Sequence, residues 1–237
     1  IFDNSMDEAV AGFAKLITIS LSKENIVTIS DDGRGIPIDP HPKFPDKSAL
    51  EVIMTTLHSG GKFSNKVYQT SGGLHGVGIS VVNALSDFMM VEVTRNNQAW
   101  QQEYSRGKPV SKLEQAGKAR IKNGTKISFH PDPEIFQDGY TFNTKKLYHL
   151  AKSKAYLFKG IKILWRCDPE LLTNLAEVKS EEEICFPNGI NDFLKSSLSE
   201  ARLVMDNFFS GSNELADNHG RVEWCVAWPV GRDATIH

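Results

Sequence analysis

The sequence predicts an α+β fold, a two-layer sandwich in which helices cover a mixed, mainly antiparallel sheet. Two observations lead to this prediction. Segments with apolar residues three or four positions apart are interleaved with segments in which apolar and polar residues alternate, and these are the periods of helices and strands. The order of the segments also lacks the regular strand–helix–strand alternation from which a parallel sheet is built.

The periodic segments follow one another along the whole chain. The first helix is expected at 5–16, where Met6, Val10, Phe13 and Leu16 recur at helical spacing. The other helices are expected at 49–57, 79–86, 143–158 and 189–198. Strands are expected at 17–20, 25–30, 89–94, 99–104, 125–130 and 161–166.

Composition excludes several classes of protein. Of the 237 residues, 40% are hydrophobic and 24% are charged, which is ordinary for a globular protein. No apolar run approaches the ~18 residues of a membrane-spanning helix, and no signal segment is visible, so a cytoplasmic location is expected. The net charge of -2 argues against direct DNA binding by these residues, because proteins that grip phosphates carry a basic excess.

The chain is expected to hold one domain and part of another. Residues 1–200 are interpreted as a complete domain, and residues 201–237 as the start of a truncated second one. Residues 210–218 are polar and typical of a linker. Residues 222–230 (VEWCVAWPV) are typical of a strand, for which no partner strand is evident in the remaining sequence. Because patterned sequence begins at once at Ile1, the chain is interpreted as a piece of a longer protein.

The first motif is DDGRGIP, at 31–37, directly after an expected strand. The carboxylate of Asp31 at a strand end can accept a hydrogen bond from an exocyclic amine such as that of adenine. Gly33 and Gly35 allow the backbone to approach a flat ring closely, and Ile36 and Pro37 offer it apolar contact. The alternative is a simple tight turn.

The second motif is SGGLHGVG, at 71–78, which leads into the helix expected at residue 79. Its glycines leave backbone N–H groups free to converge on phosphate oxygens, next to the positive end of the helix dipole. The spacing is not that of a dinucleotide-binding fingerprint. Residues 60–62 are not a Walker loop either, because Phe63 stands where Ser or Thr must hold Mg²⁺. The alternative is a flexible surface loop.

The third motif is DNSMDE, at 3–8. Asn4 offers a carbonyl oxygen to a hard cation such as Mg²⁺, and Asp7 and Glu8 lie on the same face of the expected helix. The alternative is that Asn and Asp here only cap the helix. Elsewhere, Lys62 could neutralise a terminal phosphate or be plain surface. Thr125 could donate its hydroxyl beside Asp31 or merely begin a strand.

The order of these three motifs resembles the ATP-binding (GHKL, or Bergerat) fold shared by gyrase B, Hsp90, histidine kinases and MutL. Residues 3–14, 31–37, 57–63 and 71–86 resemble the B subunits of bacterial type II DNA topoisomerases. Residues 60–86 are closer to the B subunit of topoisomerase IV (ParE) than to gyrase B. The resemblance is strong over 1–130 and looser over 131–237.

The resemblance implies a role for each matching residue. Asn4 would coordinate the Mg²⁺ of bound ATP, and Asp31 would bind the adenine amine beside Gly35 and Thr125. Lys62 and Tyr68 would belong to a lid over the nucleotide. The triphosphate would be wrapped by Gly73, Leu74, His75, Gly76, Val77 and Gly78. The apolar wall of the base pocket would be Ile1, Ile29, Ile36, Pro37, Ile53, Met54, Ile79 and Ile127. The pocket mouth, where coumarin-type inhibitors of the family bind, would be lined by Glu8, Arg34, Pro37 and Arg95, with an ion pair between Glu8 and Arg34.

The resemblance also implies an enzyme, a type II topoisomerase in which ATP binding and hydrolysis drive DNA strand passage, relaxation and decatenation. Its partners would be DNA and a DNA-cleaving A subunit (ParC-like). The general-base glutamate of the family would lie just before Ile1, and the dimerising N-terminal arm would also be missing. We therefore expect these residues to be monomeric and to bind ATP while barely hydrolysing it. The alternatives are gyrase B, a histidine kinase, a chaperone or mismatch-repair clamp, and a plain binding module.

Overall fold

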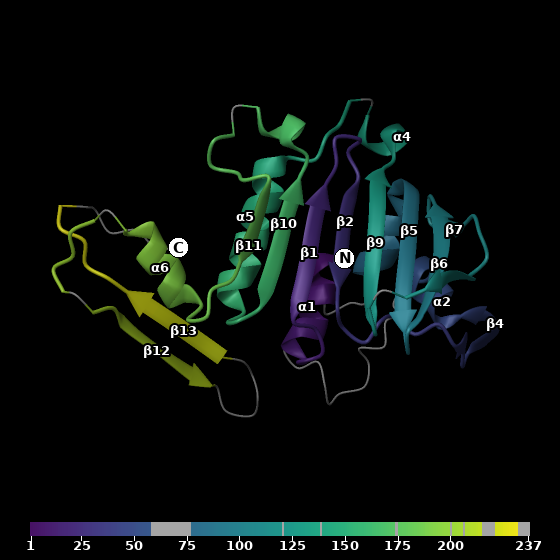
Figure 1. Ribbon diagram of the computed structural model, residues 1–237, viewed down its shortest axis with the longest axis horizontal. Helices are drawn as coiled ribbons and strands as arrows, with labels where there is room; N and C mark the ends of the chain where they lie inside the picture. Colours follow the sequence, from purple (N-terminus) through teal and green to yellow (C-terminus); the bar gives the residue numbers. More distant parts are fainter. Residues whose placement is uncertain are drawn as a thin grey trace.

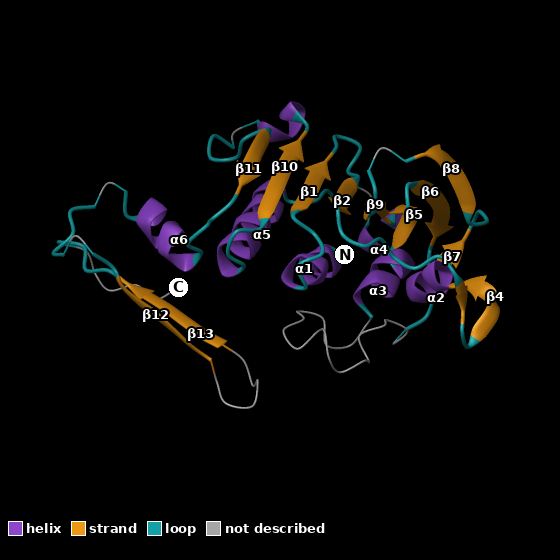
Figure 2. Ribbon diagram, turned by 60° about the horizontal axis from the view of Figure 1, so that its bottom comes forward, coloured by secondary structure: helices purple, strands orange, loops and turns teal. Residues whose placement is uncertain are grey.

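The computed structural model describes residues 1–57, 77–119, 121–137, 139–173, 175–199, 201–205, 207–214 and 221–231. Within them, nine strands form one sheet in the order β11-β10-β1-β2-β9-β5-β6-β7, with β8 paired to β6. Helices lie along one side of this sheet (Figures 1 and 2). The predicted α+β two-layer fold is confirmed.

The sheet combines six strands that the sequence predicts with three that it does not. The expected strands are β1 (Leu16–Leu21), β2 (Val27–Asp31), β5 (Ser86–Arg95), β6 (Gln98–Ser105), β9 (Gly124–Pro131) and β10 (Lys162–Cys167). The additional ones are β7 (Lys108–Pro109), β8 (Glu114–Lys118) and β11 (Glu181–Ile184). Within the described ranges, β1 and β10 form the one parallel pair of this sheet, so it is mixed and mainly antiparallel.

Five of the six described α-helices are close to their expected positions, whereas the short α4 and a 3₁₀ turn were not predicted. The six helices are α1 (Phe2–Val10), α2 (Ala49–Thr55), α3 (Gly78–Ala84), α4 (Pro133–Phe136), α5 (Thr144–Leu157) and α6 (Ile190–Ser197), with a 3₁₀ turn at Pro169–Leu172. The expected extent of the first helix was wrong at its end. Gly12 takes a left-handed φ of +79° just after α1, and Leu16 already begins β1.

The core lies between the sheet and the helices. Alternate residues of each strand face the helices, so β2 buries Val27, Ile29 and Asp31 on that side. One buried cluster combines α1, α5, β1, β2 and β10, and a second combines α2, β5, β9 and Ile36. Ile1 packs against both clusters. The start of α1 therefore lies at the boundary between the two halves of the core.

The C-terminal residues differ from the expectation. Residues 210–214 are not a linker, because β12 (Phe209–Glu214) pairs antiparallel with β13 (Arg221–Val226). The strand expected at 222–230 therefore has a partner, and it ends at Val226. A further hairpin, β3 (Pro40–His41) with β4 (Phe44–Ser48), precedes α2 and was not predicted. Among the described helices, none has the length and apolar character to span a bilayer.

Candidate functional site

The site is built around Asp31, the last residue of β2. Its side chain lies on the buried face of the sheet, with 4% of the residue exposed. Two donors reach the carboxylate: Ser5 Oγ donates to Oδ2 at 2.8 Å, and the backbone N–H of Gly33 donates to Oδ1 at 3.0 Å. In the neighbouring strand, Thr125 is paired directly opposite Asp31 and is also buried. Asp31 and Thr125 are therefore side by side, as expected.

The environment of Asp31 opposes its charge. Burial is the largest influence and raises the pKa of the carboxyl, while the hydrogen bonds from Ser5 and Gly33 lower it. The negative charges of Glu8 and Asp32 raise the pKa further. The resulting pKa is about 6, against an ordinary value of 3.8. A buried carboxylate kept so far from its usual pKa is typical of a functional site.

Gly35 brings the backbone close to the same strand ends. Its φ is +76°, and a Cβ placed there would stand 2.6 Å from the carbonyl oxygen of Thr94 and 3.1 Å from that of Gly124. Arg95 Nη1 donates to the Gly35 carbonyl at 2.9 Å, and the Ile36 N–H donates to Thr125 Oγ1 at 3.2 Å. Only glycine fits this position, so the turn that follows Asp31 is fixed by sequence.

Glu8 and Arg34 form the expected ion pair. Arg34 Nη2 donates to Glu8 Oε1 at 2.7 Å, and Arg34 Nε donates to Oε2 at 3.0 Å. The guanidinium also lies 3.8 Å from the centre of the Phe13 ring. Burial opposes the charged form of Glu8, but the hydrogen bonds and charge of Arg34 outweigh it and lower the pKa of Glu8. This pair links α1 to the turn after β2, and Pro37 is exposed in that same turn.

The apolar residues expected around the base lie on the helix-covered side of the sheet. Ile36, Met54 and Ile127 are buried in one cluster, and Ile1, Ile53 and Ile79 pack against it. Ile29 lies in the adjoining cluster. Apart from the exposed Pro37, the residues that the resemblance assigned to the wall therefore belong to the two buried clusters or pack against them.

Asn4 lies in the first turn of α1. The helix begins after Ile1 without a side-chain cap, so the alternative in which Asn4 caps the helix finds no support. Asn4 is half-buried, and its amide side chain has no hydrogen-bond partner among the described residues. Asp7 is buried, whereas Glu8 points to Arg34. The three residues were expected on one helix face, but their side chains have different surroundings.

Part of the expected phosphate loop lies outside the described residues. This applies to Lys62, Tyr68, Gly73, Leu74, His75 and Gly76. Val77 precedes the first turn of α3, and Gly78 is exposed at its first position. The end of the motif therefore leads into a helix, as predicted.

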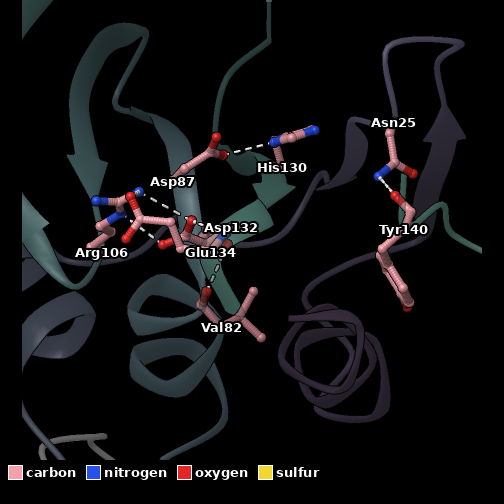
Figure 3. A network of polar contacts seen from close by, with 9 residues as sticks. Asn25, Val82, Asp87, Arg106, His130, Asp132, Glu134 and Tyr140 are labelled. Carbon is pink, nitrogen blue, oxygen red and sulfur yellow. Dashed lines mark hydrogen bonds and ion pairs between the residues drawn. The ribbon is translucent and has the colours of Figure 1, made fainter. Parts of the chain in front are cut away.

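Two polar features of the structure escaped the sequence interpretation. The first is Ser5, which lies within the third motif but was given no role. The second is a polar network at the opposite end of the sheet, where Arg106 bonds Asp132 and Glu134, and His130 bonds Asp87 at 2.7 Å (Figure 3). No motif marks this network, because its members are far apart in the sequence. Asp87 and His130 belong to β5 and β9, Arg106 follows β6, and Asp132 and Glu134 lie at the start of α4.

The matches to known proteins agree with this geometry. Residues 1–135 match the model of the histidine kinase-, DNA gyrase B- and HSP90-like ATPase family. The chain belongs to this ATPase family. Among relatives, it is 54% identical over its whole length to the B subunit of DNA topoisomerase 4 from Bartonella bacilliformis and 39% identical over 96% of its length to that from Escherichia coli. It spans 34% of the length of each.

The fold of this ATPase-family chain also matches a solved structure. The 43K ATPase domain of Thermus thermophilus gyrase B, in complex with an aminocoumarin, is 33% identical with a TM-score of 0.75. The match covers 95% of this chain and 55% of that one. The predicted resemblance to B subunits of bacterial type II topoisomerases is confirmed, including the greater similarity to topoisomerase IV.

Proposed function

We propose that this chain binds Mg·ATP where β2 ends beside the start of the antiparallel β9, with the adenine amine donating to Asp31. The observation that carries the proposal is a buried carboxylate at a strand end, followed by a turn in which Gly35 packs so closely on the carbonyl oxygen of Thr94 that a side chain would not fit. The exocyclic amine of adenine supplies a donor that the carboxylate accepts, and Thr125 lies next to it. The surrounding isoleucines give the flat ring apolar contact.

Asn4 is proposed as the Mg²⁺ ligand, because its amide is uncommitted among the described residues and a carbonyl oxygen suits a hard cation. The bound ion would neutralise charge on the triphosphate. Lys62, Tyr68 and residues 73–78 are proposed to close over the phosphates. The helix α3 begins where this segment ends, which supports a phosphate position near its first N–H groups.

We infer that the longer protein is a topoisomerase IV that couples ATP binding and hydrolysis to DNA strand passage, in the cytoplasm, together with a DNA-cleaving A subunit. The names of the relatives support this inference. The Glu8–Arg34 pair supports a coumarin-type inhibitor site at the rim, together with Pro37 and Arg95. Gyrase B is the alternative, and it is distinguished by introduction of negative supercoils by the complete enzyme.

The test is titration of the chain with a non-hydrolysable ATP analogue and Mg²⁺. Asp31→Asn should weaken binding by at least about tenfold, because losing a hydrogen bond to a charged group costs roughly 1.5–3 kcal/mol. Asp32→Asn is the matched control: this neighbouring carboxylate is exposed and accepts from the N–H groups of Lys15 and Leu16 instead. Equal affinities of Asp31→Asn and the unchanged chain for the ATP analogue would contradict the proposal that adenine binds at Asp31.

A further inference from the structure

We propose that Ser5 is a positioning residue that keeps Asp31 a hydrogen-bond acceptor, so that the site selects a 6-amino purine over a 6-oxo purine. This proposal rests on the proposed function, since it concerns the base bound at Asp31. It assigns to Ser5 a part in specificity that neither the motif nor the adenine contact itself provides.

The first step is the geometry of the Ser5 hydroxyl. Ser5 comes from α1 and has 4% of its surface exposed, and its Oγ lies 2.8 Å from Asp31 Oδ2. A serine inside a helix commonly bonds the carbonyl four residues earlier in the chain. Here the hydroxyl instead reaches out of the helix to the end of β2. This hydrogen bond therefore connects α1 to the proposed site at the end of β2 and does not stabilise the helix backbone.

The second step is the pattern of donors on the carboxylate. Ser5 donates to Oδ2 and the Gly33 N–H donates to Oδ1, so each oxygen already accepts one bond. A protonated carboxyl carries a hydrogen on one oxygen and becomes a weaker acceptor there. Two donors on two oxygens therefore favour the ionised form.

The third step is the balance of charges. Around Asp31, Glu8 of α1 and Asp32 of the same strand end are both negative, and Thr125 on the adjoining strand is uncharged. The nearby cation Arg34 is engaged by Glu8. With burial as the largest opposing influence and Ser5 first among the stabilising ones, the pKa of Asp31 is about 6. The pKa of Asp31 therefore lies only about one unit below neutral pH, and the hydrogen bond from Ser5 helps to keep it there.

The fourth step is what ionisation does to base choice. A 6-amino group donates to an ionised carboxylate. A 6-oxo group is an acceptor, so it leaves the ionised carboxylate facing another acceptor, which costs the desolvation of both. A protonated carboxyl can donate to the 6-oxo group instead. Loss of the Ser5 bond should thus raise the share of protonated Asp31 and relax the selection.

The experiment compares non-hydrolysable analogues of ATP and ITP, each with Mg²⁺, across pH 5 to 8.5. Their phosphates titrate alike, so the ratio of the two affinities isolates the base. In the unchanged chain this ratio should fall as pH drops through about 6. In Ser5→Ala the fall should begin at higher pH, and at pH 7 the ratio should be lower by at least about fivefold to tenfold.

Two further variants make the result specific. Ser5→Thr keeps the hydroxyl and should restore the ratio and its pH profile. Ser128→Ala is the matched control, because it removes a serine hydroxyl that bonds Thr28 at 2.8 Å on the opposite face of the sheet. Should Ser5→Ala fail to fold, as judged by its melting curve, Ser5→Cys serves in its place, with a weak donor and an intermediate shift expected.

The outcomes separate the two proposals. An unchanged ratio and pH profile in Ser5→Ala, alongside weakened ATP binding in Asp31→Asn, would overturn the role of Ser5 and leave the adenine site standing. Failure of the unchanged chain to bind the ATP analogue, or indifference to Asp31→Asn, would overturn the proposed function itself.

Discussion

At the scale of single residues, the buried charge of Asp31 lowers the stability of the folded chain at neutral pH. Burying a carboxylate disfavours its charged form, and two hydrogen bonds only partly offset that effect. Such a group is expected where function requires it, because a neutral side chain of similar shape would be easier to bury. The destabilising effect of the buried charge should make the free energy of unfolding depend on pH.

Replacing Asp31 by Asn should stabilise the protein above pH 7. The pKa of Asp31 is raised to about 6 in the folded chain from 3.8, so between these values the folded state binds more protons than the unfolded one. The free energy of unfolding of the unchanged chain therefore falls as pH rises through this window. Asp31→Asn should be more stable by about 1–3 kcal/mol at pH 8, with the difference vanishing near pH 4.

Urea unfolding of both chains at pH 4.5 and pH 8 measures this difference. If Asp31→Asn were less stable than the unchanged chain at pH 8, the conclusion that the buried charge of Asp31 destabilises the fold would be contradicted. The same measurement shows that weakened nucleotide binding in Asp31→Asn is not caused by unfolding.

Individual site residues were predictable to different degrees. Asp31 and Gly35 were found because they lie in one motif, and the Glu8–Arg34 pair was expected because the resemblance implies it, although the two residues are 26 positions apart. Ser5 was missed because the resemblance implied no role for it, and a serine in a helix has many ordinary uses. A hydrogen bond across two elements is visible only once the helix is docked on the sheet.

At the scale of elements, periodicity located the long helices and strands but not the short ones. In β11, three of the four residues are glutamates, and the strand exists because β10 pairs with it. Ion pairs of Glu181 with Arg166 and of Glu183 with Lys162 accompany that pairing. Similarly, β12 contains no apolar alternation, yet Gly211 lies opposite Trp224 and accommodates its ring. These strands form because a neighbouring strand pairs with them, and that pairing cannot be read from the local sequence pattern.

The turn after β6 is joined to the end of β9 by one buried carboxylate. Asp132, with 2% of its side chain exposed, accepts from Arg106 Nε at 2.7 Å and from the N–H of Glu134 at 3.0 Å (Figure 3). It also caps α4. Asp132→Ala should lower the melting temperature by at least about 2–4 °C, because it removes the buried acceptor of Arg106 Nε and leaves the first N–H groups of α4 without their cap.

Glu134→Ala is the matched control in the same network. Glu134 also pairs with Arg106, at 2.7 Å, but 72% of its side chain is exposed. An exposed pair contributes little, so this variant should change the melting temperature by under about 1–2 °C. Equal effects of the two variants in thermal unfolding would show that burial of Asp132 is not what matters.

At the scale of the whole molecule, the proposed nucleotide site and the polar network lie at opposite ends of the sheet. The register places Asp31, Thr125 and Val93 in one row at the end proposed to bind nucleotide, whereas Ser86 and Pro131 pair at the other. The polar network of Arg106 and Asp132 fixes that second end. The β12–β13 hairpin lies apart from both, beyond α6 (Figure 1).

Among the residues that the structure describes, those of the hairpin contribute nothing to the proposed nucleotide site. Among the described residues, the hairpin contacts the preceding chain mainly through α6 and through an ion pair of Glu223 with Lys159 at 2.6 Å. Several of its side chains and those beside it are exposed, including Phe209, Val222 and Trp228. These features support the proposed boundary near residue 200.

Residues 1–200 should therefore fold without the hairpin and keep the nucleotide site. The buried clusters are made entirely of residues before that boundary, so removing 201–237 takes nothing from the core. Affinity for the ATP analogue should stay within about threefold of that of the full 237 residues, a difference of roughly 0.6 kcal/mol. Titration and urea unfolding of both chains measure this. A loss of affinity above tenfold, or of cooperative unfolding, would mean that 201–237 belong to the ATP-binding domain and that the boundary lies elsewhere.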